Sequence, residues 1–262
     1  MVRAFSSLGC AELELAAVLE LARQYGLAAV ELRALADTID LPAYFQRRCG
    51  SPDKLAAVVA AAGVRVVALD ASFQLGNPDE AQREELLALG PWAEALDGVP
   101  IRVFDGSKVM DAAMLAAANA HLAWWSQTRR RRSWHSPLLV ETHDVLFTAA
   151  GINAFLAAMP AGTGILWDAF HTWGKGGEDP VQTWAAIKAA VRHIHVKDGV
   201  RVAPGQPLRH TLPGQGEFPL RALLTQLQAD GYAHALSLEY GRKWHPYLPP
   251  LPEALAALKG WW

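Results

Sequence analysis

Eight short apolar segments, each followed by an amphipathic stretch, determine what this chain of 262 residues can fold into. The apolar segments have the length of strands. The amphipathic stretches carry apolar residues at spacings of three and four, as helices do. "SPDKLAAVVAAAG" also has helix boundaries, with Ser51 as the N-terminal cap and Gly63 at its end. No linker or change of composition interrupts the pattern, so we predict a single domain over residues 1–262.

Strands that alternate with helices form parallel sheets. The predicted strands are "VRAFSS", "AAVELR", "VRVVALD", "IRVFDG", "PLLVETHD", "TGILWDAFH", "VRHIHVKD" and "HALSLEY". Eight such units in about 250 residues match the size of a closed α/β barrel, the (β/α)8 or TIM barrel, whose site lies at the C-terminal ends of the strands. An open doubly wound sheet is the alternative, but the first strand–helix turn "SSLGCAE" lacks GxGxxG.

Composition narrows the function classes. The net charge is only −2, which predicts no attraction to nucleic acid or to an anionic membrane. The two cysteines, Cys10 and Cys49, lie far apart without a CxxC motif, which argues against disulfides and thiolate metal sites. No apolar run approaches the roughly 18 residues of a membrane span, and the N-terminal segment does not resemble a signal peptide. We therefore expect a cytoplasmic protein.

Polar residues follow the predicted strands at the edge where a barrel carries its chemistry. They are Glu31, Asp70, Asp105, Glu141, Asp168, His195 and Glu239. The last four belong to strands five to eight, which are neighbours in a barrel, so their side chains should converge on one half of its mouth. All nine histidines lie at or after His121, which assigns imidazole chemistry to the second half of the chain.

A single carboxylate at a strand end is usually a solvated surface charge. Three crowded carboxylates repel one another and lose hydration, which is costly unless a cation compensates them. Three carboxylates and one imidazole suit Mn²⁺, Mg²⁺, Co²⁺ or Zn²⁺. We predict one divalent metal ion, bound by Glu141, Asp168, His195 and Glu239.

The flanking residues leave alternatives open. His193 and His195 share one face of a strand, and only one of them can lie at the rim. We interpret His195 as the ligand and His193 as a deeper, hydrogen-bonded core residue. Lys197 either reaches the substrate or only pairs with a nearby carboxylate. His171 is a second ligand, a substrate contact or an ordinary loop residue, and we favour the substrate contact.

The segment "DGVRVAPGQPLRHTLPGQGEF" shows no periodic structure over about twenty residues, which is typical of a functional loop. We predict a lid that brings Arg201 and His210 to the substrate; the alternative is a disordered insertion. After the eighth strand, "GRKWHP" adds Arg242, Lys243 and His245, which form either a phosphate site near the last loops or a solvated basic loop.

The motifs "LLVETHD", "WDAFHTW", "HIHVKD", "LPGQGEF" and "SLEYGRKWHP", in this order, resemble the xylose-isomerase-like TIM-barrel superfamily. Its members are sugar isomerases and epimerases, inosose dehydratases and isomerases, and apurinic endonucleases. The segments "SSLGC", "VELR" and "RVFDG" fall where members place strands one, two and four, so the resemblance spans the whole chain.

Carried over by position, the resemblance implies the same four metal ligands. From the ketose 3-epimerase branch it implies Glu141 and Glu239 as the acid/base pair, and His171 and Arg201 as contacts to the sugar. One departure is Gln215, which stands between two glycines where an acidic residue is common. The arginine also lies in a different local context from that of the epimerases.

We therefore expect a metal-dependent isomerase or epimerase of a small sugar or polyol-derived carbonyl compound, with proton transfer through an enediolate. A dehydratase of the inosose or 3-dehydroshikimate type is the nearest alternative, because the same enolate can expel a β-hydroxyl. An apurinic-site endonuclease is disfavoured by the absence of histidine before His121. A non-catalytic relative is disfavoured by the intact ligand set. The C-terminal "LKGWW" is either a packing tail or a contact in a homo-oligomer.

Overall fold

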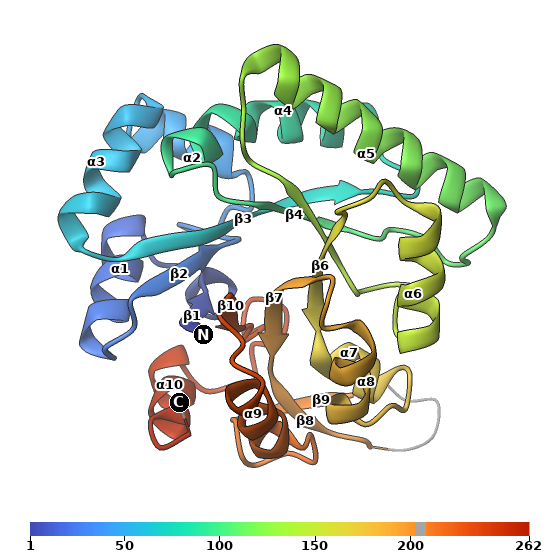
Figure 1. The fold of residues 1–262 in the computed structure, drawn as a ribbon. Coiled ribbons are helices and arrows are strands. Elements are labelled where there is room, and N and C mark those ends of the chain that lie inside the picture. The colour runs from blue at the N-terminus through green and yellow to red at the C-terminus, as the bar shows by residue number, and fades with distance from the viewer. Residues whose placement is uncertain (203–207, 262) are drawn as a thin grey trace.

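Eight parallel strands close into a barrel in the computed structural model, which describes residues 1–202 and 208–261. Their order around the barrel is β1-β10-β7-β6-β5-β4-β3-β2, so the chain runs once around it and β1 closes against β10 (Figure 1). The barrel strands are β1 (Val2–Ser6), β2 (Ala29–Leu32), β3 (Arg65–Gln74), β4 (Ile101–Phe104), β5 (Leu138–Glu141), β6 (Gly164–Asp168), β7 (Val191–Val196) and β10 (Ala235–Leu238). The predicted fold class is confirmed.

Helices surround the barrel (Figure 1). They are α1 (Leu15–Gln24), α2 (Leu41–Arg48), α3 (Pro52–Ala62), α4 (Glu80–Ala95), α5 (Ala112–Arg132), α6 (Ala149–Ala158), α7 (Ala169–Gly174), α8 (Pro180–Ile187), α9 (Leu220–Ala229) and α10 (Leu251–Leu258), with a 3₁₀ turn, η1, at Ser7–Cys10. Within the described part of the chain, no helix combines the length and apolar character needed to cross a membrane.

Two of these helices were not predicted. The first, α2, is short, and its N-terminal cap is Asp40, whose carboxylate accepts the backbone N–H of Ala43 at 3.0 Å. The second, α7, occupies residues that the apolar pattern had assigned to the end of a strand. Its N-terminal cap is Asp168, so the strand stops at this carboxylate and the chain turns directly into a helix.

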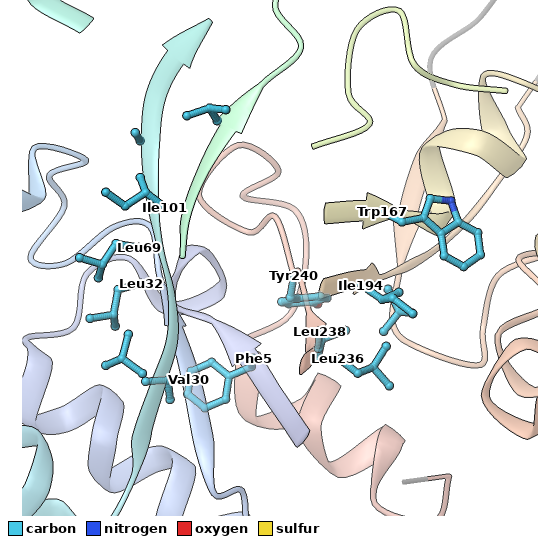
Figure 2. Packing of buried hydrophobic residues seen from close by; sticks show 14 of the residues in the cluster. Phe5, Val30, Leu32, Leu69, Ile101, Trp167, Ile194, Leu236, Leu238 and Tyr240 are labelled. Atoms are coloured by element: carbon cyan, nitrogen blue, oxygen red, sulfur yellow. The ribbon is translucent and has the colours of Figure 1, made fainter. Parts of the chain in front are cut away.

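The two faces of the barrel strands bury different kinds of side chain, apolar on one face and charged on the other. Side chains such as Val30, Leu69 and Ile194 belong to the apolar core (Figure 2). Because successive side chains of a strand alternate in direction, their neighbours Glu31 and His195 lie on the other face, and their side chains meet inside the barrel. The interior at the C-terminal end of the barrel is therefore filled by charged groups.

The segment predicted to lack periodic structure instead contains two strands. They are β8 (Asp198–Val200) and β9 (Arg209–Thr211), which pair antiparallel. Residues 203–207 of the predicted lid lie outside the described residues. The prediction was wrong because three-residue strands are too short to show a period.

The "LPGQGEF" motif fastens this β8–β9 hairpin to the barrel. The Asp198 carboxylate accepts backbone N–H groups from Gly214 at 2.7 Å, from Gly216 at 3.1 Å and from Phe218 at 3.3 Å. A Cβ on Gly216 would lie 2.0 Å from Oδ1 of this carboxylate, so only glycine fits here. We call these hydrogen bonds from the backbone amides of the motif to Asp198 the clasp. The side chain of Gln215 is not part of it.

Candidate active site

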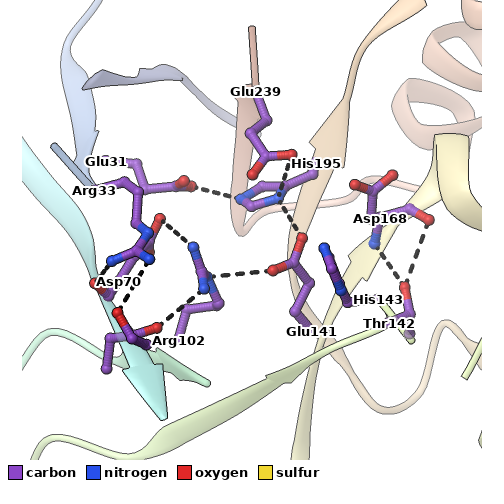
Figure 3. Close-up of polar contacts among 12 residues, drawn as sticks. Glu31, Arg33, Asp70, Arg102, Glu141, Thr142, His143, Asp168, His195 and Glu239 are labelled. Carbon is purple, nitrogen blue, oxygen red and sulfur yellow. Dashed lines mark hydrogen bonds and ion pairs between the residues drawn. The ribbon is translucent and has the colours of Figure 1, made fainter. Parts of the chain in front are cut away.

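Four side chains at neighbouring strand ends form a compact polar cluster (Figure 3). Glu141 ends β5, Asp168 ends β6, His195 lies near the end of β7, and Glu239 directly follows β10. One donor atom from each lies within 4.8 Å of the other three, and all four residues are buried. We call these residues the ligand quartet. Their predicted convergence is confirmed, while their role as metal ligands stays a prediction.

Strand register and a helix cap position the quartet. Asp168 and His195 are direct neighbours across β6 and β7. The Oδ1 atom of Asp168 accepts the backbone N–H of His171 at 2.9 Å, because this carboxylate caps α7. The cap leaves the other oxygen, Oδ2, directed toward Lys197, at 2.7 Å from Nζ. One residue therefore serves both as a helix boundary and as a member of the site.

Glu31, a carboxylate outside the quartet, orients the imidazole of His195. Its Nδ1 lies 3.2 Å from Glu141 Oε1 and 3.6 Å from Glu239 Oε2, whereas its Nε2 lies 2.9 Å from Glu31 Oε2. Burial alone would lower the pKa of His195, but Glu31 and Glu239 outweigh it and hold the pKa well above its ordinary value. The ring thus presents Nδ1 to the quartet while Nε2 is held by Glu31.

His193 has the deeper position that was predicted for it. Its Nε2 lies 2.7 Å from Ser237 Oγ and 3.0 Å from Glu31 Oε2, and the ring is buried. Sequence analysis had placed Glu31 at a strand end without giving it a role. The signal was present in "VELR", where a carboxylate ends an apolar strand, but the contact between Glu31 and His195 joins residues 164 positions apart and cannot be read from spacing.

Lys197 lies between two members of the quartet. Its ammonium group contacts Asp168 and Glu239. Burial alone would lower the pKa of Lys197, yet Asp168 and Glu239 raise it, so the amine is charged. The predicted pairing with a carboxylate is confirmed. This buried cation also shows that the carboxylates of the quartet attract positive charge.

An arginine inside the barrel supports the quartet from β4. The guanidinium of Arg102 lies 3.2 Å from Asp70 Oδ2 and 3.3 Å from Glu141 Oε2, and it lies 4.2 Å from the centre of the Phe104 ring. Burial would raise the pKa of Glu141, but Arg102 lowers it below its usual value. Sequence analysis did not assign Arg102, although a charged residue within the apolar "IRVF" was a usable signal.

A cavity of about 290 Å³ opens over the cluster. Of the predicted substrate contacts, His171, Lys197 and His210 line it, together with Glu239. Trp244 and His245 also line it, and so do four side chains that sequence analysis did not assign, Arg33, Arg102, Phe104 and His143. The wall therefore combines imidazoles and cations with a few apolar groups.

The two histidines that were predicted to touch substrate are neutral at physiological pH. Burial and the nearby Lys197 lower the pKa of His171 well below its ordinary value and that of His210 to about 3. His171 Nδ1 donates to the carbonyl oxygen of Thr142 at 3.0 Å, which leaves Nε2 as an acceptor in the neutral ring. A neutral imidazole of this kind can accept a hydrogen bond from a hydroxyl group.

Arg201 does not have the predicted position. Its guanidinium lies 3.7 Å from the centre of the Trp173 ring and donates to the Trp173 carbonyl oxygen at 2.8 Å, outside the lining of the cavity. Stacking on the indole face and a backbone acceptor satisfy it there. The other residue of the predicted lid, His210, does face the cavity from β9.

The quartet has the chemistry of a divalent-metal site. Its donor set is three carboxylates and one imidazole, which suits hard and borderline divalent ions. Glu141 Oε2 and Asp168 Oδ2 are buried and accept no hydrogen bond of regular geometry. Glu141 Oε2 meets the guanidinium of Arg102, and Asp168 Oδ2 meets the ammonium of Lys197 and lies 3.3 Å from His171 Nδ1. Buried carboxylate oxygens in this situation have coordination capacity left for a metal ion. The residues present fit such an ion.

A closed parallel barrel with this polar cluster at its C-terminal end belongs to the class of barrels that carry their chemistry there. The sequence profile of the xylose isomerase-like TIM barrel family matches residues 19–261. The chain therefore belongs to the xylose isomerase-like TIM barrel family. No curated protein matches it in sequence.

Solved structures share the fold over nearly the full length of this chain. An IolI protein with a bound zinc atom superposes with a TM-score of 0.78 at 20% identity, covering 99% of this chain and 96% of its own. The probable 3-DHS dehydratase AsbF of Bacillus anthracis gives 0.76 at 16% identity, covering 98% of both chains. The 3-keto-D-glucoside 4-epimerase YcjR of E. coli gives 0.71 at 14% identity, covering 99% of both.

Proposed function

We propose that this protein is a divalent-metal-dependent isomerase or epimerase of a small sugar or polyol-derived carbonyl compound. The observation that carries the proposal is the ligand quartet, whose donor atoms gather beneath a polar cavity. Membership of a family whose solved structures include sugar epimerases supports it. A bound divalent ion would polarise a substrate carbonyl and acidify the adjacent C–H.

Glu141 and Glu239 are the proposed proton carriers. They come from the two ends of the arc β5-β6-β7-β10, so two strands separate them. Burial would raise the pKa of Glu239, but Lys197 and His195 hold it well below its usual value. Arg102 lowers the pKa of Glu141. Both carboxylates are therefore ionised at neutral pH. One can take a proton from the substrate while the other returns it.

The other predicted contacts complete the proposal. His171 and His210 would accept hydroxyl hydrogens of the substrate, and Lys197 would face its oxygens. Arg201 is kept as a substrate contact on the ketose 3-epimerase resemblance alone. It can reach the cavity only if it leaves the face of Trp173.

A dehydratase is the second candidate, favoured by His143. This imidazole lines the cavity, and its Nδ1 lies 2.8 Å from Asp144 Oδ1. Burial would lower the pKa of His143, but Asp144 and Glu141 outweigh it and raise the pKa. A charged imidazole could protonate a departing hydroxyl. The likeness in fold to the probable dehydratase AsbF agrees with this alternative. Product analysis separates the two, because only dehydration releases water.

Turnover in D₂O tests the mechanism. Purified enzyme would be screened with ketoses, inososes and hydroxylated cyclic ketones, and deuterium in product would be measured by mass spectrometry. We expect Glu141→Gln and Glu239→Gln each to lower net conversion by at least about 100-fold, the usual size of an acid–base contribution. Glu20→Gln, on the exposed side of α1, is the matched control. Normal turnover in either active-site variant would remove that glutamate from the mechanism.

A further inference from the structure

Arg33 is a buried cation that lines the cavity and forms no ion pair with a carboxylate in the described part of the chain. It directly follows β2, is 5% exposed and lines the cavity. Its Nη1 donates to the carbonyl oxygen of Asp70 at 3.3 Å and its Nη2 to Ser72 Oγ at 3.2 Å, both neutral acceptors. Among the described residues, no carboxylate oxygen lies within 4.0 Å of this guanidinium, in contrast to Arg102 and Lys197.

This arrangement is costly in the free protein. A buried charge without a partner loses hydration and receives no compensating ion pair. Burial, with added repulsion from the nearby guanidinium of Arg102, lowers the pKa of Arg33 to about 10, and the carboxylates of Asp70, Glu85 and Glu141 offset this only in part. Glu85, on α4, instead accepts the backbone N–H of Ser72. A negative group inside the cavity would remove this cost.

Arg33 and the ligand quartet occupy different arcs of the barrel. The strand β2 is separated from β5 by β3 and β4, and from β10 by β1. The same cavity of about 290 Å³ is lined by Arg33 from one arc and by Lys197 and Glu239 from the other, so one small molecule bound in it can contact both. Leu8 and Phe104 line the same cavity and would contact the carbon skeleton between its two ends.

We propose that the substrate is a hydroxylated acid that also carries an aldehyde or ketone group, and that Arg33 binds its carboxylate while the quartet acts on its carbonyl end. The role given to the quartet rests on the proposed function, whereas the role given to Arg33 does not. The planar fork of a single guanidinium matches a carboxylate. A phosphate dianion would call for more free cations, and Arg242 and Lys243 are directed elsewhere, to Glu12 and to the Asp37 carbonyl.

Binding measurements on acid and amide pairs test this, because each pair differs by one charge at constant shape. The probes are D-glucuronate, D-galacturonate and quinate, each compared with its amide, titrated calorimetrically into the purified protein with Mn²⁺ present. We expect at least one acid to bind ten or more times more tightly than its amide. In Arg33→Gln that preference should fall to within twofold, and in Arg33→Lys part of it should remain.

The control is Arg48→Gln, which removes an exposed arginine paired with Glu14 and should keep the full preference. If no acid binds more tightly than its amide, or if the preference persists in Arg33→Gln, the proposal is wrong. The lysine variant serves the same test if the glutamine variant fails to fold. This test measures binding and does not depend on turnover. If acids bind selectively but no deuterium enters the product in D₂O, the proposed reaction is wrong and the carboxylate site at Arg33 is still supported.

Discussion

At the scale of single residues, the site is organised by a histidine with a different partner at each ring nitrogen. His195 offers Nδ1 to Glu141 and Glu239, and its Nε2 is held by Glu31. A carboxylate behind a ligating imidazole fixes the tautomer and the ring orientation, and it makes the ligand more basic. Glu31 is thus a positioning residue for the predicted ligand.

Glu31→Gln should therefore weaken divalent-metal binding about 10- to 100-fold, the usual effect of losing such a partner. The amide oxygen can still accept the Nε2 hydrogen, so the loss reports the missing negative charge. Mn²⁺ and Zn²⁺ affinities would be measured by competition with a chelating indicator.

The matched control for this variant is Ser237→Ala, which removes an equally buried partner of His193 and leaves His195 untouched. Its metal affinity should stay within about twofold of wild type, because the group that holds His195 is still present. Equal affinities in wild type and Glu31→Gln would show that Glu31 does not act through the ligand.

At the scale of elements, one carboxylate fastens the β8–β9 hairpin, which also packs against the ring of Phe170. Asp198 collects the amides of the "LPGQGEF" segment, and this fastens β9, whose His210 lines the cavity. The imidazole of His210 also stacks on that of His245, with ring centres 4.3 Å apart. The conformation of this part of the cavity wall therefore depends on a polar clasp.

Gly216→Ala should break that clasp. The added Cβ would lie 2.0 Å from Asp198 Oδ1 and 2.5 Å from Gly199 N, so atoms on both sides must move. We expect a loss of unfolding free energy of about 1–3 kcal/mol, as in overpacked sites, measured by urea denaturation. Gly260→Ala is the control, since nothing lies within 4 Å of its added Cβ. Equal stability of the two variants would mean that the clasp adapts easily.

At the scale of the whole molecule, the quartet exists only in the closed barrel. Its members come from four strands, and the chain between Glu141 and Glu239 must fold before their donor atoms approach one another. An ion that binds only the folded state stabilises that state by mass action. Metal content and stability should therefore be linked.

We expect about one divalent ion per chain by elemental analysis. Removing it with a chelator should lower the thermal midpoint by roughly 5–10 °C, which corresponds to about 2.7 kcal/mol of binding at a hundredfold excess over Kd. Asp168→Asn should show no such shift, because asparagine keeps the helix cap and lacks the ligand charge. A midpoint that is the same with and without metal would contradict the site.

Much of the architecture followed from the sequence because it depends on local patterns. Strand and helix periods are set by neighbouring residues, so eight strands, eight helices and the strand-end quartet could be predicted. The short helix α7 was missed because Ala169 and Phe170 continue the apolar run of β6, and the Asp168 cap alone marks the boundary. The β8–β9 hairpin was missed because its strands are too brief to show a period.

The sequence by itself determined the barrel and which four residues meet at its mouth, because parallel strands carry their ends to one edge. Only the tertiary structure decided which charges pair. Glu31 reaches His195, Arg102 reaches Glu141, and Arg33 donates to the hydroxyl group of Ser72. Charge pairing across a barrel depends on distances between strands that are remote in the chain, and residue spacing along the chain does not specify those distances.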